Sequence, residues 1–141
     1  MIFKVINMIT EGRANMSTYL FAVPIAAGKT EAFKNYVSEI NGARSEEFRQ
    51  SRKRVGVRVD QAFLQQTPRG DMVIVRLESD NPMKAFEIWA KSDNPFDAWF
   101  REKIMIESLG MDLSLPFSQN QQIMDYHETP TREHVKTWID G

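Results

Sequence analysis

The hydrophobic positions in the first half of the chain predict one strand, one long helix and a pair of strands. Residues 18–25 form a continuous apolar, β-rich run, and residues 57–66 and 72–79 alternate apolar with polar side chains, as strands do. Residues 31–54 carry apolar side chains at the spacing of a helix with one buried stripe. Gly42 lies inside this helix at a cost of about 1 kcal/mol relative to alanine, so it marks a bend or a close packing contact.

The sequence TPRGD at residues 67–71 predicts a hairpin turn between the two alternating strands. Val57, Val59 and Phe63 are placed to share one face of the first strand, and the odd-numbered residues of 73–77 share one face of the second. The opposite faces mix charged and apolar side chains, namely Arg58, Asp60, Ala62, Leu64, Ile74, Arg76 and Glu78. This mixture predicts a cavity or a partly wet interface on that side of the sheet.

The second half of the chain predicts two short helices and a last strand. The helices begin at Pro82 and Pro95, each preceded by an asparagine that suits the N-cap. Gly110 ends the second helix. After a loop, residues 122–128 are expected to form a fourth strand.

The predicted order of elements is β-α-β-β-α-α-β, which describes a ferredoxin-like antiparallel sheet with helices on one face. The other face of such a sheet must be polar or covered. Since that face is mixed here, we expect a second copy of the chain to cover it, forming a homodimer with the architecture of a dimeric α+β barrel.

The chain divides into three parts: an N-terminal extension at residues 1–17, a ferredoxin-like domain at 18–128 and a C-terminal helical tail at 129–141. We hypothesise that translation naturally begins at Met16, because residues 11–13 can be encoded by a purine-rich run that resembles a bacterial ribosome-binding site. The alternative is an N-terminal strand or arm that packs on a partner.

Composition excludes several classes of protein. The chain has 141 residues, 42% of them hydrophobic, a net charge of −1 and no cysteine, so disulfides and thiol chemistry are excluded and nucleic-acid binding is not favoured. No apolar run approaches the roughly 18 residues of a membrane span. We therefore expect a cytoplasmic protein without a cofactor, a metal or a membrane partner.

The stretch PIAAGKTEAF at residues 24–33 resembles the end of a phosphate-binding loop. That loop needs a glycine five residues before Gly28, where this chain has Val23, and Pro24 offers no backbone N–H. The stretch is better interpreted as a turn at Gly28 followed by a helix with Thr30 at its N-cap.

Three stretches carry a resemblance to a known family: AGKTEAF, QAFLQQTPRGDMVIVRLES and, above all, WAKSDNPFDAWF. They resemble small, mostly bacterial dimeric α/β-barrel proteins of undetermined function, which are related in fold to the antibiotic-biosynthesis monooxygenase group. The resemblance covers about Thr18 to Glu128. It implies the fold and, by fold analogy, oxygenation or isomerisation of a small molecule, although fold alone does not fix function.

Asp97 is the first candidate for chemistry, since it lies in the densest polar stretch beside aromatic residues. In the functional interpretation Asp97 is a base or a hydrogen-bond acceptor, and Trp89, Trp99 and Phe100 form the wall of an apolar pocket. In the structural interpretation, which we favour, Asp97 is a first-turn carboxylate that helps to cap its helix.

His127 is the second candidate, because a histidine that titrates near neutral pH can act as a general acid or base. Asp125 would share its face of the last strand, with Tyr126 beside them, and Arg76 is placed to face the same space as a ligand-binding residue. A metal site at Asp125 and His127 would need more ligands than the sequence supplies.

Two functions are compatible with the sequence. The first is an enzyme, monooxygenase-like or isomerase-like and independent of a cofactor, that acts on a small apolar or aromatic molecule through Asp97 and His127. The second is a non-catalytic dimer that binds a small ligand or acts by interaction. A pocket of about 300 Å³ or more that Asp97 or His127 enters would favour the enzyme.

Overall fold

Three β-rich segments pair into one antiparallel sheet in the computed structural model, which describes residues 17–115 and 120–129. Strand β3 (Gly70–Ser79) lies in the middle, between β1 (Ser17–Pro24) and β2 (Val57–Thr67). Tyr19 of β1 lies opposite Leu77 of β3, so the hydrophobic side chains of the two strands meet on one face. The sheet is therefore built around a tight β2–β3 hairpin, to which β1 adds from the start of the chain.

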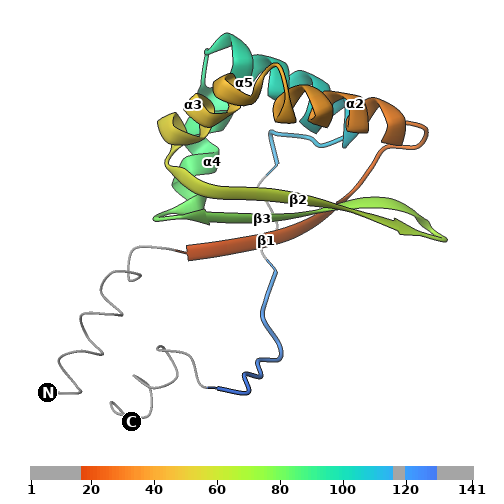
Figure 1. The fold of residues 1–141 in the computed structure, drawn as a ribbon, viewed down its shortest axis with the longest axis vertical. Coiled ribbons are helices and arrows are strands. Elements are labelled where there is room, and N and C mark those ends of the chain that lie inside the picture. Colours follow the sequence, from red (N-terminus) through yellow and green to blue (C-terminus); the bar gives the residue numbers. More distant parts are fainter. Residues whose placement is uncertain (1–16, 116–119, 130–141) are drawn as a thin grey trace, which may run out of the picture.

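All the described helices lie on one face of this sheet, giving two layers (Figure 1). The chain crosses from β1 to β2 through α2 (Thr30–Asn41) and α3 (Ser45–Val55), and α4 (Pro82–Lys91), α5 (Pro95–Phe100) and the π-helix η1 (Arg101–Ser108) follow β3. The core fills the space between the layers and contains Ile25, Phe33, Ile40, Val55, Val73, Trp89, Ile104, Met105 and Leu109.

The single helix predicted over residues 31–54 is wrong, because the chain turns between α2 and α3. Gly42 ends α2, and the backbone N–H groups of Gly42 and Arg44 both donate to the carbonyl of Glu39. A Cβ on Gly42 would lie 3.1 Å from the carbonyl oxygen of Ser38, which leaves little room for a side chain there. The glycine thus marks a sharp turn, and the apolar stripe continues onto the second helix.

The predicted alternation of β2 is also wrong, because the strand contains a β-bulge. Val57 pairs with Ser79 and Val59 pairs with Glu78, so Arg58 is an extra residue between them. Uninterrupted alternation from Val57 would place Val59 and Phe63 on the same face as Val57. The extra residue moves these and the other later side chains of β2 to the opposite face. Asp60 faces the helices, and Val59 and Phe63 lie on the open face.

The expected fourth strand at residues 122–128 is not formed. Residues 120–127 have no regular secondary structure, and Ile123, Met124 and Tyr126 are each more than four-fifths exposed. The segment touches the sheet where the side-chain amide of Asn120 donates to the carbonyl of Leu20, and then runs away from it (Figure 1). An extended segment without a neighbouring strand cannot form the ladder of hydrogen bonds that defines a strand.

The helix starts agree with the sequence. Asn81 accepts a hydrogen bond from the backbone N–H of Lys84 at 3.1 Å, and Asn94 accepts one from Phe96 at 2.9 Å, so both asparagines cap their helices as predicted. Gly110 has the left-handed conformation (φ 61°) expected where the last helix ends. The predicted N-terminal extension up to residue 16 and the terminal helix from residue 130 lie outside the described residues.

Candidate functional site

A mostly apolar cavity of about 210 Å³ lies between the helix-facing side of the sheet and the helices above it. Val73, Val75 and Leu77 of β3 form its floor, as the alternation of that strand predicts. Aromatic side chains surround it from several elements, namely Phe21, Phe33, Phe48, Phe86, Trp89 and Phe100. The volume exceeds the roughly 150 Å³ of an apolar cavity known to admit benzene.

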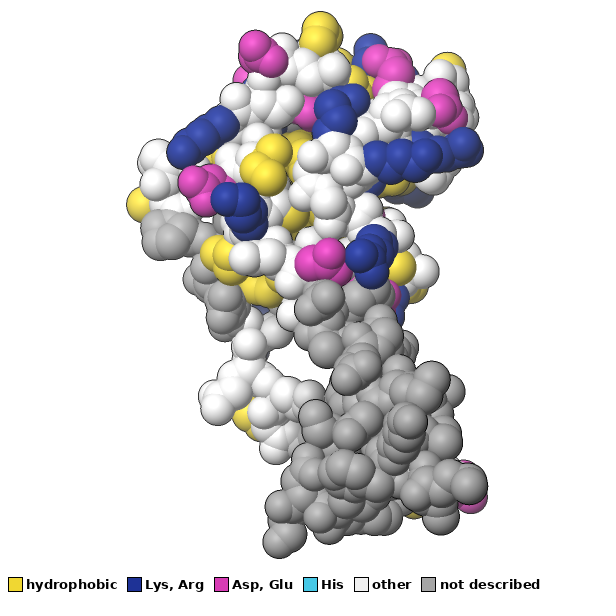
Figure 2. Space-filling view, turned by 90° about the vertical axis from the view of Figure 1, so that its left-hand side faces the viewer, with side chains coloured by type: hydrophobic (Ala, Val, Ile, Leu, Met, Phe, Trp, Pro, Cys, Tyr) yellow, Lys and Arg dark blue, Asp and Glu magenta, His cyan; other side chains and the backbone are white. Residues whose placement is uncertain are grey.

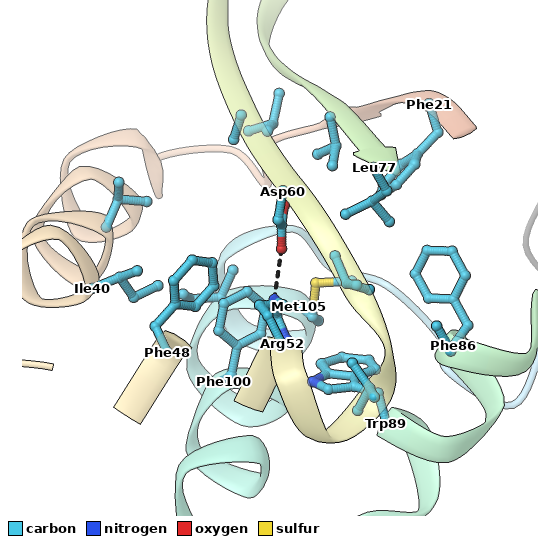
Figure 3. A pocket seen from close by; sticks show the side chains of 18 of the residues that line it. Phe21, Ile40, Phe48, Arg52, Asp60, Leu77, Phe86, Trp89, Phe100 and Met105 are labelled. Atoms are coloured by element: carbon cyan, nitrogen blue, oxygen red, sulfur yellow. Dashed lines mark hydrogen bonds and ion pairs between the residues drawn. The ribbon is translucent and has the colours of Figure 1, made fainter. Parts of the chain in front are cut away.

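An ion pair faces this apolar space. Nε of Arg52 in α3 donates to Oδ2 of Asp60 in β2 at 2.7 Å, and the two side chains are only 12% and 17% exposed (Figure 3). Asp60 reaches the cavity because of the β-bulge at Arg58. The guanidinium carbon of Arg52 lies 4.6 Å and 4.7 Å from the ring centroids of Phe48 and Phe100, which places the charge beside two aromatic rings.

Trp89 carries a buried polar group at the wall of the cavity. Its side chain is 5% exposed, and its indole N–H has no hydrogen-bond acceptor among the described residues. The ring meets Phe100 edge to face at 5.8 Å, and Figure 3 shows its nitrogen on the side turned toward Phe100. A buried donor without an acceptor costs about 1–3 kcal/mol. The nitrogen is closed to water in this structure, so a bound molecule would accept its hydrogen bond only after a small movement of the ring toward the cavity.

The end of the cavity is formed by η1 and the residue that follows it. Ile104, Met105 and Leu109 line the space, and the backbone N–H of Leu109 donates to the carbonyl of Ile104, five residues earlier, at 3.0 Å. This wider turn is rare, and π-helical turns are frequent at functional sites. The backbone N–H of Ala26 donates to the carbonyl of Ser108 at 2.8 Å, which fixes the end of the helix to the chain after β1.

Asp97 lies outside the cavity lining, and its fully buried side chain is the centre of a separate hydrogen-bond network. Its carboxylate accepts hydrogen bonds from Ser51 Oγ at 2.5 Å, from Ser92 Oγ at 2.6 Å and from Arg54 at 3.2 Å. Burial alone would raise the pKa of Asp97, but these hydrogen bonds and the charge of Arg54 outweigh it, and the pKa is lowered. The side chain joins α5 to α3, and among the described residues its partners do not include the backbone N–H groups at the start of α5, so the capping role favoured from the sequence is not observed.

The other predicted site residues are distributed over the molecule. Trp89 and Phe100 line the cavity together, whereas Trp99 packs against Tyr36 and lies under Arg44, whose guanidinium carbon is 4.1 Å from the ring centroid. Arg76 lies on the open face of the sheet, where it bonds to Gln61 and Glu78. His127 pairs with Asp125 at 2.8 Å, and Tyr126, which lies between these two residues in the chain, is exposed.

Sequence reasoning missed the two charged residues of the cavity. Arg52 lies in the basic last turn of α3 and was not among the candidate residues, and Asp60 was assigned to the wrong face of its strand. The signal that could have found them is the pairing of an arginine and an aspartate in elements that are consecutive in the chain.

The Gly28-Lys29-Thr30 stretch makes a turn, as predicted, with Gly28 at a φ of 75°. Thr30 is not the N-cap but the first residue of α2, and its hydroxyl donates to Asp71 at 2.6 Å. The hydroxyl therefore connects the helix start to the β2–β3 hairpin.

Comparisons with protein-family models, curated proteins and solved structures find no match to this chain. Within the described residues, no helix is long and apolar enough to cross a membrane. In the same part of the chain, no three histidine, aspartate or glutamate side chains come together as a metal site would require. The interpretation of function therefore depends on the geometry of the cavity.

Proposed function

We propose that the protein binds a small, mostly apolar or aromatic molecule in the cavity between sheet and helices. The observation that carries this proposal is the cavity itself, which aromatic side chains surround and whose lining includes the Arg52–Asp60 pair and Trp89. An apolar cavity with a few polar groups that fix orientation is the usual form of a small-molecule site. The cavity is smaller than typical drug-sized sites, so it suits a molecule of one aromatic ring with a short chain.

We favour binding over catalysis, because neither Asp97 nor His127 lines the cavity. Among the described lining residues, Asp60 is the side chain that could accept a proton, and Arg52 already holds its carboxylate. A monooxygenase-like or isomerase-like reaction would have to use that carboxylate in place of the two residues expected from the sequence.

A neutral aromatic alcohol tests the proposal. We expect 3-phenylpropan-1-ol to bind and to shift the indole N–H signal of Trp89 in ¹H–¹⁵N spectra, because its hydroxyl can accept the hydrogen bond. The Trp89→Phe variant should bind the alcohol roughly three- to tenfold more weakly, the loss expected for one hydrogen bond. Trp99, which does not line the cavity, provides the internal control: its signal should not move. Absence of binding, or a shift at Trp99 alone, would refute the proposed function.

We also propose that the domain is ferredoxin-like and forms a homodimer through the open face of its sheet. The strand order β1-β3-β2 with helices on one face supports this, since it is the order of three neighbouring strands in that fold. The open face carries Leu20, Phe63 and Ile74, which are 43%, 56% and 36% exposed. Burial of such a face against a second copy would give a dimeric α+β barrel.

Phe63→Glu should convert the dimer into a monomer, because it would place a charge in the middle of the buried apolar face. Native mass spectrometry would report the mass of two chains for the wild type and of one chain for the variant. Leu64→Glu is the matched control, since Leu64 is also exposed but lies on the opposite side of β2. Wild-type protein that stays monomeric at high micromolar concentration would contradict the dimer.

A further inference from the structure

The Arg52–Asp60 pair lies at the boundary between the apolar cavity and an open groove on the surface. Arg52 and Asp60 line both spaces, together with Phe48 and Val57. We name the open space the basic groove; its charged lining residues are Arg49, Arg52, Lys53, Arg58, Asp60 and Asp80. A molecule in the cavity would therefore have one end at this pair and at the groove beyond it.

The charge of the basic groove favours an anion. Of its described lining residues, four carry a positive charge and two a negative charge. Arg58 pairs with Asp80 at 3.1 Å, Arg52 pairs with Asp60, and Arg49 pairs with Glu46 just outside the lining at 3.1 Å. Lys53 is the lining cation that has no ion-pair partner among the described residues, and it gives the groove its excess of positive charge. Figure 2 shows the end of the molecule that carries the end of α3 and the start of β2, where basic side chains lie among acidic ones with hydrophobic side chains between them. Such an excess attracts anions toward the pair.

Arg52 has a nitrogen that donates no hydrogen bond to any described residue. Its Nε donates to Asp60 and its Nη1 to Ser51 Oγ at 3.1 Å, whereas Nη2 has no hydrogen-bond partner among the described residues. A guanidinium binds carboxylates through two parallel N–H groups, and the rings of Phe48 and Phe100 hold this one in place. Among the residues that line the cavity, Arg52 thus keeps a donor for a ligand, Nη2, while the carboxylate of Asp60 is already engaged.

We propose that the natural ligand is an amphipathic carboxylate, with an apolar body in the cavity and its carboxylate on Arg52 at the basic groove. This inference rests on the proposed function, and it adds the chemical class of the ligand. The ligand's carboxylate approaches the guanidinium that Asp60 already holds. The two negative charges therefore compete for Arg52, and Asp60 limits the affinity.

A matched pair of ligands separates the two proposals. 3-Phenylpropanoate and 3-phenylpropan-1-ol share the same body and differ in the terminal group. In calorimetric titrations at neutral pH, we expect the acid to bind the wild type about tenfold more tightly than the alcohol, since hydrogen bonds to a charged group are about twice as strong as neutral ones. Asp60→Asn should raise the affinity for the acid several-fold and leave the alcohol within about twofold.

The double variant R52Q/D60N removes both charges together, so no buried charge is left without a partner. We expect it to bind acid and alcohol equally, while Arg69→Gln, an arginine change in the exposed hairpin turn, keeps the wild-type preference. If the alcohol binds and the acid is no tighter, or if R52Q/D60N keeps the preference, the carboxylate inference is overturned and the proposed function stands. If neither ligand binds the wild type, both are overturned.

Discussion

Replacing Asp97 with alanine should lower the free energy of unfolding by about 3 kcal/mol, because hydrogen bonds to a buried charged group contribute about 1.5–3 kcal/mol each. The carboxylate is fully buried and accepts from Ser51, Ser92 and Arg54. The substitution leaves the two hydroxyls without their acceptor and disconnects α5 from α3. Arg54 adds less, since its side chain is 38% exposed and can turn to water. Urea denaturation followed by circular dichroism would measure the loss.

The matched control for Asp97 is Asp93→Asn, an exposed aspartate four residues earlier, which should change stability by less than about 0.5 kcal/mol. Because the pKa of Asp97 is lowered in the folded protein, its contribution is complete above the unfolded pKa of about 4 and is lost as the pH falls toward the lower folded value. The deficit of the alanine variant should therefore shrink in acid. A deficit that is the same at pH 7 and pH 3 would contradict the hydrogen-bond network as its source.

Replacing Trp89 with alanine should lower the free energy of unfolding by about 3 kcal/mol, near the lower end of the range for removing a buried aromatic side chain. The side chain is 5% exposed and meets Phe100 edge to face. The loss stays at the lower end because the substitution also removes the buried N–H that lacks an acceptor. Thermal unfolding would show the effect as a fall in Tm.

Two further variants, one at the neighbouring Ile88 and one at Trp89 itself, serve as controls for Trp89→Ala. Ile88→Ala, at a neighbouring residue that is 43% exposed, should change stability by less than about 0.5 kcal/mol. Trp89→Phe keeps a ring in the site and should lose much less stability than the alanine variant. Equal losses for Ile88→Ala and Trp89→Ala would show that α4 as a whole, and not the ring in the cavity, is responsible.

Local rules predicted the elements of this domain well and their interruptions poorly. The Asn-Pro helix starts and the Thr67–Asp71 turn depend on a few adjacent residues, so their signals are present in the sequence itself. The bulge at Arg58 depends on how β2 pairs with β3, and no residue type marks it. Residues 122–128 have the composition of a strand, but a strand also needs a partner, which local sequence does not reveal.

The cavity shows the same division between local and long-range information. The functional interpretation of the sequence placed Trp89, Trp99 and Phe100 in the wall of an apolar pocket, and Trp89 and Phe100 do line the cavity, whereas Trp99 does not. Asp97 was expected to be a base or a helix cap, but two of the three partners that fix its role, Ser51 and Arg54, come from α3, 46 and 43 residues away. The Arg52–Asp60 pair escaped notice because one missed residue in the strand alternation turned Asp60 to the wrong side.

The bulge makes position 58 tolerant of change in both side chain and length. Arg58 is exposed and makes one surface pair with Asp80, so many substitutions there should be tolerated. Removal of the residue should also leave the faces of β2 as they are, because Val57 would still pair with Ser79 and Val59 with Glu78, now in an uninterrupted ladder. Asp60 would stay on the side of the cavity and Phe63 on the open face. Inserting or removing one residue between Val59 and the hairpin turn is different, because part of β2 would then exchange faces.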